Sequence, residues 1–206
     1  MLTVDHFRRA IGRHDSYRVA EREGVSRAAV AAIMRDREEG AELLLIQRTD
    51  HPEDPWSGHM AFPGGRVDDA DDGPVAAAIR ETREELALDL QVEGELIGRL
   101  SDVPAVGRGR PLPLVIEPYL FQIHGDPELV PNHEVATAVW VPMRFLTDRS
   151  NRSKMDWKRG GADVKLPCYR YEGHLIWGLT FGMVDELVEL VAPSAHGPTG
   201  WRGPLD

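Results

Sequence analysis

One segment near the middle of the chain constrains its structure most, because it combines a glycine turn with closely spaced glutamates. A strand-like run ends in Phe62-Pro63-Gly64-Gly65, and Arg80-Glu81 and Glu84-Glu85 follow on a stretch with helical periodicity. Positions i, i+3 and i+4 of an α-helix share one face, so the three carboxylates fall within an arc of about 100°. Like charges at this spacing destabilise an isolated helix by about 0.2–0.5 kcal/mol per pair. The sequence therefore predicts that a positive charge lies against this helix.

A divalent cation is the positive group that suits this helix face. Hard cations such as Mg²⁺ take oxygen ligands from one or two carboxylates and from substrate phosphates. Arg80 lies four residues before Glu84, and an ion pair between them would hold that carboxylate in position. We therefore expect three carboxylates to bind Mg²⁺, or alternatively Mn²⁺: Glu81, Glu84 and Glu85.

The helix also carries a narrow apolar stripe, which predicts the side that faces the core. The stripe falls within about 60° of arc, and the glutamate arc is centred roughly 120–140° away, towards solvent or a cleft. A solvated acidic helix is the alternative interpretation, but it leaves the glycine turn unexplained. Gly64 and Gly65 let the backbone approach a ligand closely, so we expect them at the substrate. The members of the stripe are Val75, Ile79, Thr82 and Leu86.

This segment resembles a Nudix box. The usual form of that motif is Gly, five residues, Glu, seven residues, Arg-Glu, an apolar residue, any residue, Glu-Glu, any residue, Gly and an apolar residue. Arg80–Glu85 matches the second half of the form. The stretch from Gly65 to Arg80 is one residue longer than usual, and Asp72 stands where the first Glu belongs. Thr82 replaces the apolar residue and Ala87 replaces the second Gly, so the departures concern the loop and the packing of the helix.

The resemblance covers roughly residues 28–191 and implies both a fold and an activity. The implied fold class is α/β, a Nudix-type α/β/α sandwich with a mixed β-sheet. The implied activity is that of a metal-dependent pyrophosphohydrolase, an enzyme that cleaves a nucleoside diphosphate linked to another moiety. Nudix enzymes often recruit an acidic residue from a loop outside the box as a metal ligand or general base, and Glu134 is the candidate here. A solvated loop residue is the alternative for Glu134. The catalytic residues expected on this basis are Arg80, Glu81, Glu84 and Glu134.

Within that family the chain is most similar to the coenzyme A pyrophosphatase branch. The similarity lies in Leu44–Thr49, Gly58–Gly65 and Tyr171–Thr180, and it implies cleavage of coenzyme A or its derivatives to 3′,5′-ADP and 4′-phosphopantetheine. The insert Glu53-Asp54-Pro55-Trp56 departs from the branch, which carries a basic residue there. The alternatives are an ADP-ribose, dinucleotide or nucleoside triphosphate pyrophosphatase, or a non-catalytic Nudix-fold module that binds nucleotides.

Several residues outside the box are candidates for contact with the substrate. Arg48 closes the first of the similar stretches, and Arg108 and Arg110 lie in a loop rich in glycine and proline. Guanidinium groups bind phosphates through paired hydrogen bonds, although a solvated loop arginine is the alternative. Trp56 would either stack on an adenine ring or anchor its loop by packing.

Other acidic and metal-ligating side chains near the box have more ordinary explanations. The aspartates of this loop, at positions 68, 69, 71 and 72, precede Gly73-Pro74 and suit turns and the first turn of a helix. His59 has no second histidine or cysteine at ligand spacing, so the sequence gives no zinc site.

Composition and charge limit the class of partner. A net charge of −10 over 206 residues opposes non-specific binding to nucleic acid or an anionic membrane, so a small diphosphate is the expected partner. Cys168 is the one cysteine, which excludes an internal disulfide and suggests a small buried residue of the Leu166–Tyr171 strand. The sequence has no run of 18 apolar residues and no signal-peptide pattern, so we expect a cytoplasmic protein, with homodimerisation left open.

The chain divides into three expected parts: a helical N-terminal extension at 1–24, a Nudix hydrolase domain at 25–192 and a flexible C-terminal tail at 193–206. The extension should contain a helix with Val4, Phe7 and Ile11 on one face. Expected loops are Asp102–Pro113 and Asn151–Asp163. Other expected elements are a hairpin of Ala28–Met34 and Glu42–Ile46, strands at Val92–Leu100, Leu114–Ile123 and Ala136–Val141, a short helix after Pro142 and a last helix at Trp177–Val191.

Overall fold

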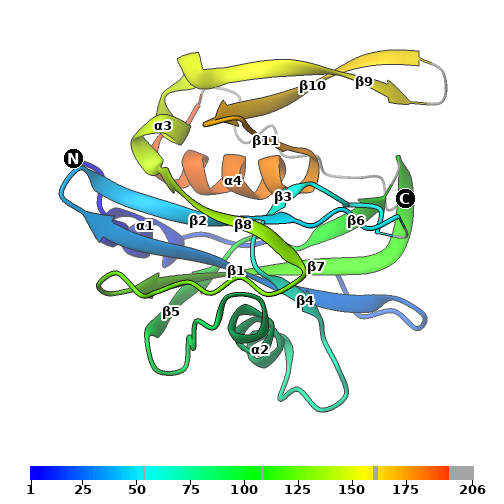
Figure 1. Cartoon of the computed structure of the whole chain (residues 1–206), viewed down its shortest axis with the longest axis horizontal. Helices are drawn as coiled ribbons and strands as arrows, with labels where there is room; N and C mark the ends of the chain where they lie inside the picture. The colour runs from blue at the N-terminus through cyan, green and yellow to red at the C-terminus, as the bar shows by residue number, and fades with distance from the viewer. Residues whose placement is uncertain (53, 108, 160–161, 195–206) are drawn as a thin grey trace.

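A parallel pair of strands forms the centre of the main β-sheet (Figure 1). The computed structural model describes residues 1–52, 54–107, 109–159 and 162–194, and within them β1 (Ser26–Arg37) runs parallel to β7 (Arg110–Ile123). β2 (Gly40–Arg48) returns antiparallel to β1, which confirms the expected hairpin. The other strand pairs of this sheet are antiparallel, so the predicted mixed sheet is also confirmed.

Shorter elements surround these three strands. In the described part of the chain the main sheet has eight strands in the order β3-β2-β1-β7-β5, with β4 paired to β1, β6 to β7 and β8 to β2. Its other strands are β3 (Met60–Ala61), β4 (Gly64–Arg66), β5 (Gly94–Arg99), β6 (Val103–Gly107) and β8 (Val135–Pro142). A second antiparallel sheet contains β9 (Arg152–Arg159), β10 (Ala162–Tyr171) and β11 (His174–Trp177). The helices are α1 (Val4–Ile11), α2 (Pro74–Leu86), α3 (Met143–Thr147) and α4 (Gly178–Val191), with a 3-10 turn at Arg149–Asn151.

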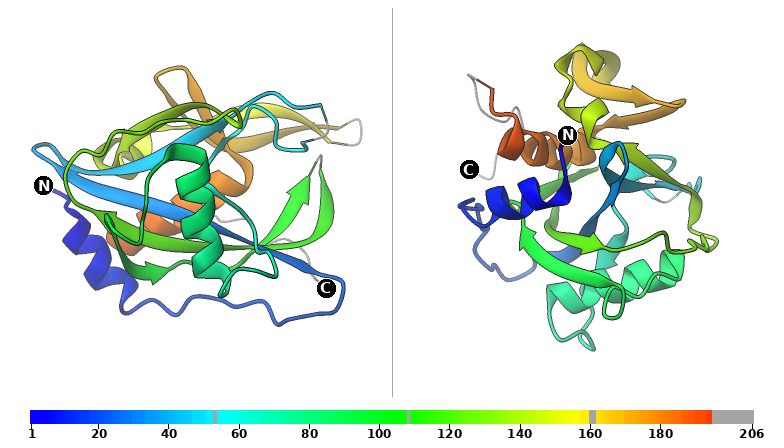
Figure 2. Two further views of the ribbon diagram at one scale, coloured as in Figure 1. Left: turned by 60° about the horizontal axis from the view of Figure 1, so that its bottom comes forward. Right: turned by 90° about the vertical axis from the view of Figure 1, so that its left-hand side faces the viewer.

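Two hydrophobic cores lie on opposite faces of the main sheet, because successive side chains of a strand point to opposite sides. Ala31 and Ile33 of β1 pack in the core that contains Leu86 of α2. Ala32 and Met34 of the same strand pack in the core that contains residues of α1 and α4. Figure 2 shows α2 on one side of the sheet and α1 and α4 on the other. This layering is the expected α/β sandwich.

Most of the elements expected from apolar periodicity are confirmed. α1 buries Val4, Phe7 and Ile11, α3 begins directly after Pro142, and α4 occupies nearly all of the expected last helix. Cys168 is buried in β10, as its small apolar character suggested. None of the helices in the described segments is long and apolar enough to cross a membrane.

The segment Asp102–Pro113 is not the loop that its glycines and prolines predicted. Its described residues include β6 and the first residues of β7, which pair antiparallel with Gly107 opposite Arg110. Proline lacks the amide hydrogen that a central strand needs, but edges and bulges tolerate it. Pro104 lies where the β6–β7 register is irregular, between Pro104 and Val106, so it does not end the strand.

The prediction of a loop over Asn151–Asp163 is also wrong for the residues that the structure describes. β9 runs through most of this segment and pairs antiparallel with β10. Met155 and Trp157 are half-buried, whereas the charged residues that alternate with them are exposed. This is the two-residue period of a strand with one apolar face. Two apolar residues are too few for the sequence pattern to predict a strand. The strand forms because its backbone pairs with β10.

The orientation of α2 corrects part of the predicted apolar stripe. Thr82 and Leu86 are buried as expected, but Val75 and Ile79 are only half-buried, and Glu85 is 2% exposed. Two small alanines between these positions lie fully buried against the sheet and allow a close approach of the helix. The glutamate face is therefore turned further towards the protein interior than the sequence indicated.

The predicted C-terminal tail falls largely outside the described residues. Positions 193 and 194 follow α4, and 195–206 are not described.

The end of α2 generates a prediction about stability. Ala87 terminates the helix in the left-handed conformation, with φ of 56°. A side chain in this conformation is strained by about 1–2 kcal/mol, whereas glycine adopts it freely. Ala87→Gly should therefore raise the free energy of unfolding by about 0.5–1 kcal/mol in urea denaturation, after the added freedom of the unfolded chain is subtracted.

A matched substitution inside the same helix should have the opposite sign. Ala76 has helical backbone, so Ala76→Gly should lower the free energy of unfolding by about 0.5–1 kcal/mol. If Ala87→Gly also destabilised the protein, the strain assigned to Ala87 would be wrong.

Candidate functional site

Two glycines of β4 bring the glutamate face of α2 directly against the main-chain atoms of the sheet. Gly64 has φ of 143°, and a Cβ atom there would lie 2.2 Å from the Ala29 carbonyl oxygen of β1. A Cβ atom on Gly65 would lie 2.4 Å from the carboxyl carbon of Glu81. A side chain at Gly64 would collide with the backbone of β1, and one at Gly65 would displace the Glu81 carboxylate, so the glycine pair sets the distance between the glutamate face of α2 and the sheet. Both glycines also line the pocket in front of α2, where we expected them to meet the substrate.

The carboxylate of Glu85 is the most deeply buried group of the site. Its residue is 2% exposed, and one of its oxygens accepts a hydrogen bond of 2.9 Å from the Gly64 amide. Burial raises the pKa of Glu85 to about 8, although the Gly64 amide and Arg48 oppose the shift; Glu81 and Glu134 add to it. A carboxylate in these surroundings needs a nearby cation to be ionised at neutral pH.

Glu81 and Glu84 complete the acidic face and differ in exposure. Burial also raises the pKa of Glu81, against the opposing effect of Arg80. The Glu84 side chain is about half exposed, at 52%. With Glu85 and Glu134, both line one pocket of about 580 Å³, which is within the range of small-molecule sites. The structure thus brings the three expected metal ligands and the expected outside carboxylate to one cavity.

Arg80 acts as a brace between the helix and the loop that precedes it. Its Nε and Nη2 donate to the two oxygens of Asp71 at 2.9 Å each. Its Nη1 donates to Glu81 at 2.9 Å and to Glu84 at 3.3 Å. The predicted Arg80–Glu84 ion pair is therefore present. Through these contacts Arg80 links the Asp71 loop to α2 and holds two of its glutamates.

Asp71, which the sequence assigned only to the turns of its loop, is a member of the site because it binds Arg80. Its paired bond to Arg80 lowers the pKa of Asp71 to about 2, so it is ionised at all physiological pH values. The Asp68 amide also donates to Asp71, which confirms the turn expected for the aspartate-rich loop. The longer loop before α2 thus supplies the carboxylate that anchors Arg80. No local pattern marks this pairing, because it spans nine residues and depends on how the loop folds.

Glu134 reaches the pocket through its position next to β8. The Thr49 amide donates to the Glu134 carbonyl, and the Asn132 amide donates to the Glu85 carbonyl. The Glu134 side chain is 52% exposed. The backbone bonds hold this loop against β2 and α2, so a half-exposed carboxylate faces the buried ones across the cavity.

Arg48 is the basic residue of the same pocket, and the acidic insert neutralises it. Its Nε donates to Asp54 at 2.7 Å, and the second oxygen of Asp54 accepts from the Trp56 amide at 2.9 Å. Trp56 donates its indole N–H to the Val106 carbonyl at 3.0 Å, which supports the packing interpretation of this residue. Glu53, the other acid of the insert, lies outside the described residues.

The two remaining arginine candidates receive no support from the geometry. Arg108 lies outside the described residues. Arg110 is exposed at the start of β7 and is not among the described residues that line the carboxylate pocket. The structure therefore brings Arg48, but not Arg110, to the acidic face of α2.

The donor set fits a hard divalent cation. The described lining of the pocket contains several carboxylates, two imidazoles (His59 and His133) and no cysteine, and carboxylate oxygens are the ligands that Mg²⁺ and Mn²⁺ prefer. Among the described residues, no three acidic, histidine or cysteine side chains converge tightly enough to form a finished metal centre. Arg80 holds Glu81 and Glu84 in place, and the buried Glu85 carboxylate needs a positive charge nearby to be ionised. These three side chains therefore suit the binding of a divalent cation.

Comparison with known proteins agrees with this geometry. The NUDIX domain family matches residues 25–158. The chain is 35% identical over 162 residues to the uncharacterized Nudix hydrolase NudL of Enterobacter sp. (strain 638), a match covering 78% of this chain and 81% of the relative. It is 33% identical over 162 residues to the protein of that name from Escherichia coli (strain K12), which covers 78% of this chain and 79% of the relative.

A solved structure shares the fold. A MutT/nudix family protein from Enterococcus faecalis has a TM-score of 0.52 at 20% sequence identity, and the match covers 84% of this chain and 63% of that chain. At this identity the likeness concerns the fold alone. Family match, relatives and carboxylate-bearing helix lead to one conclusion: the chain belongs to the Nudix hydrolases and is an enzyme that acts on phosphoanhydride bonds.

Proposed function

We propose that this enzyme is a divalent-metal-dependent pyrophosphohydrolase of nucleoside diphosphates linked to another moiety, and that coenzyme A or a derivative is its substrate. The observation that carries the metal-dependent part is the burial of Glu85 among further carboxylates of one cavity. A diphosphate cannot approach this much negative charge unless a cation screens it. Mg²⁺ is the proposed ion, with Mn²⁺ as the alternative.

The residues of the pocket divide the chemical work. We assign Glu81, Glu84 and Glu85 as metal ligands, and Glu134 as the group that accepts a proton from the attacking water. A bound ion held by these carboxylates would supply the positive charge that neutralises the charge developing at phosphorus. Arg80 holds two of the ligands in place through its bonds to Glu81 and Glu84.

Three resemblances support coenzyme A as the substrate: those of Leu44–Thr49, Gly58–Gly65 and Tyr171–Thr180 to the coenzyme A pyrophosphatase branch. The products would be 3′,5′-ADP and 4′-phosphopantetheine. The acidic insert adds negative charge near the pocket, but it does not oppose this reaction. The reason is that the Asp54 carboxylate is paired with Arg48. ADP-ribose, dinucleotides and nucleoside triphosphates remain the alternative substrates, since they need the same catalytic helix and differ in the pocket walls.

The wider organisation is part of the same proposal. We assign residues 25–192 to the hydrolase domain and 1–24 to an N-terminal extension, whose helix α1 packs in the core that also contains α4. Small diphosphates are the proposed partners, in keeping with a net charge of −10 that opposes nucleic acid and anionic membranes. We propose a cytoplasmic location and a homodimer as the oligomeric state.

Neutral variants of the glutamates test the site assignment. Glu84→Gln and Glu85→Gln keep the shape of the side chain and remove one charge each, so folding should survive. Turnover of a diphosphate substrate at saturating Mg²⁺ should fall about 100-fold or more, the scale of a lost electrostatic partner of the transition state. Glu93→Gln, an exposed glutamate outside the pocket, is the matched control and should retain wild-type kcat. Near-normal turnover by both α2 variants would refute the assignment.

The raised pKa of Glu85 predicts how the stability of the metal-free enzyme depends on pH. The pKa of Glu85 is about 8 in the folded protein and near 4.5, the ordinary value for a glutamate, in the unfolded chain, so the folded state holds the proton more tightly. This contribution to stability is present below about pH 4.5 and is lost as pH rises towards 8, by an amount on the order of a few kcal/mol.

Thermal unfolding in a chelator and in excess Mg²⁺ checks this dependence. In the chelator, the Tm of wild type relative to Glu85→Gln should fall between pH 5 and pH 8. Excess Mg²⁺ should raise the wild-type Tm most near pH 8, because the ion binds the ionised form of the Glu85 carboxylate. Equal Mg²⁺ shifts in wild type and Glu85→Gln would remove Glu85 from the set of ligands.

A substrate panel tests the proposed specificity. We expect kcat/KM with Mg²⁺ or Mn²⁺ to be higher for coenzyme A than for ADP-ribose, NADH or a nucleoside triphosphate. A tenfold preference for any of the others, about 1.4 kcal/mol in transition-state binding, would refute coenzyme A and leave the pyrophosphohydrolase standing. Absence of turnover on the whole panel by folded protein would favour the non-catalytic binding module.

A further inference from the structure

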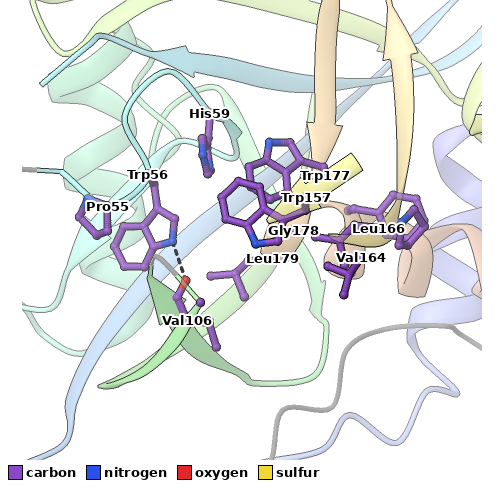
Figure 3. Close-up of a pocket in the computed structure, with 14 residues that line it drawn as sticks. Pro55, Trp56, His59, Val106, Trp157, Val164, Leu166, Trp177, Gly178 and Leu179 are labelled. Carbon is purple, nitrogen blue, oxygen red and sulfur yellow. Dashed lines mark hydrogen bonds between the residues drawn. The ribbon is translucent and has the colours of Figure 1, made fainter. Parts of the chain in front are cut away.

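A second hollow opens beside the carboxylate pocket and is lined by aromatic and aliphatic side chains (Figure 3). Its volume is about 330 Å³. Three of the five tryptophans of the chain line it: Trp56, Trp157 and Trp177. All three are half-buried, and partly uncovered aromatic side chains gathered in a concave surface are typical of binding sites. We call this site the tryptophan hollow.

The tryptophan hollow and the carboxylate pocket are continuous. Four residues line both: Trp56, His59, Trp177 and Leu179. A molecule whose charged end lies at Glu81 and Glu85 can therefore extend past these side chains into the hollow without leaving the protein surface. The occupant of the hollow is accordingly the rest of the molecule that the carboxylate pocket holds.

The lining of the hollow excludes a charged or strongly polar occupant. None of its described lining residues carries a permanent charge. The indole N–H of Trp56 is already bonded to the Val106 carbonyl, as the dashed line in Figure 3 marks. Burial lowers the pKa of His59, so this imidazole is neutral at pH 7. Such a surface gains most by covering hydrocarbon.

The shape of the hollow favours an aliphatic group over a flat base. The rings of His59 and Trp177 have centroids 4.6 Å apart and an angle of 54° between planes. Trp157 and Trp177 are also 4.6 Å apart, at 47°. Tilted rings make a concave corner instead of two parallel walls, so a nucleobase would find no flat slot between them. A branched or linear hydrocarbon needs no such slot.

The small sheet builds one side of the hollow. Trp157 of β9 pairs in register with Val164 of β10, and both side chains line the cavity. Trp177 ends β11, and Leu179 follows in the first turn of α4. The sheet of β9, β10 and β11 therefore has a role beyond packing: it holds an apolar wall next to the catalytic helix.

We propose that the tryptophan hollow binds an aliphatic group that the substrate carries close to its diphosphate, on the side away from the nucleoside. This inference rests on the proposed function and narrows its substrate class. In coenzyme A, the carbon chain that leaves the diphosphate carries a quaternary carbon with two methyl groups. In ADP-ribose the same place is taken by a sugar with several hydroxyls, which this wall cannot satisfy. The hollow thus selects branched hydrocarbon over a second sugar.

A homologous series of n-alkyl phosphates, from methyl to hexyl, tests the hollow without any need for turnover. Calorimetric titration in excess Mg²⁺ should show affinity rising up to about fourfold for each added methylene until the hollow is filled. Val164→Phe fills the hollow, and Trp157→Ala removes part of its wall, so both should flatten the dependence on chain length. Lys158→Ala is the matched control, since this exposed neighbour on β9 does not line the cavity, and it should leave the dependence intact.

The outcomes separate this inference from the proposed function. A chain-length dependence in wild type that both variants flatten supports the hollow, even if no diphosphate is hydrolysed. No dependence in wild type, or no binding by any member, overturns it, even if coenzyme A is cleaved. If Val164→Phe weakens adenosine 5′-monophosphate but not hexyl phosphate, the hollow belongs to the nucleobase and the proposal is also overturned.

Discussion

The hydrogen bond from the Gly64 amide to the Glu85 carboxylate fixes the rest of the site. It exists because β4 offers two glycines where any side chain would collide with β1 or with Glu81. α2 can then lie close enough to the sheet to bury an acidic group. Once that contact is made, the helix repeat places the neighbouring carboxylates and Arg80 on the same side of α2, at the pocket. Burial without a full ion pair destabilises the metal-free protein, which is the usual signature of a site built for a cation.

The elements with strong local periodicity could be predicted from the sequence, and those with one-sided or interrupted patterns could not. The β1–β2 hairpin, α1 and α4 carry long apolar signals that tertiary structure did not override. β9 carries only two half-buried apolar residues among charged ones, and β6 contains Pro104. β9 and β6 are strands because they pair with β10 and β7. The local sequence pattern of a segment carries no information about such partners.

The same division holds within the site. The common face of Glu81, Glu84 and Glu85 follows from residue spacing alone. How deeply Glu85 is buried does not, because it depends on glycines twenty and twenty-one residues earlier and on small alanines that let α2 lie close to the sheet. The Asp71–Arg80 bond and the tryptophan hollow are also products of folding. In the hollow, residues from five separate parts of the chain meet, and the spacing within any one of those parts does not show that they come together.

Arg48 and Asp54 show how the acidic insert is compatible with an anionic substrate. A free pair of carboxylates beside the pocket would repel a diphosphate, but Asp54 accepts from both Arg48 and the Trp56 amide. Its charge is therefore used to hold one residue of the carboxylate pocket and one of the tryptophan hollow. A phosphate that binds Arg48 must share it with Asp54, which weakens that contact. Under the proposed function, recognition would shift from the phosphate charge towards the hydrocarbon assigned to the hollow, and this short insert contacts both the polar and the apolar part of the site.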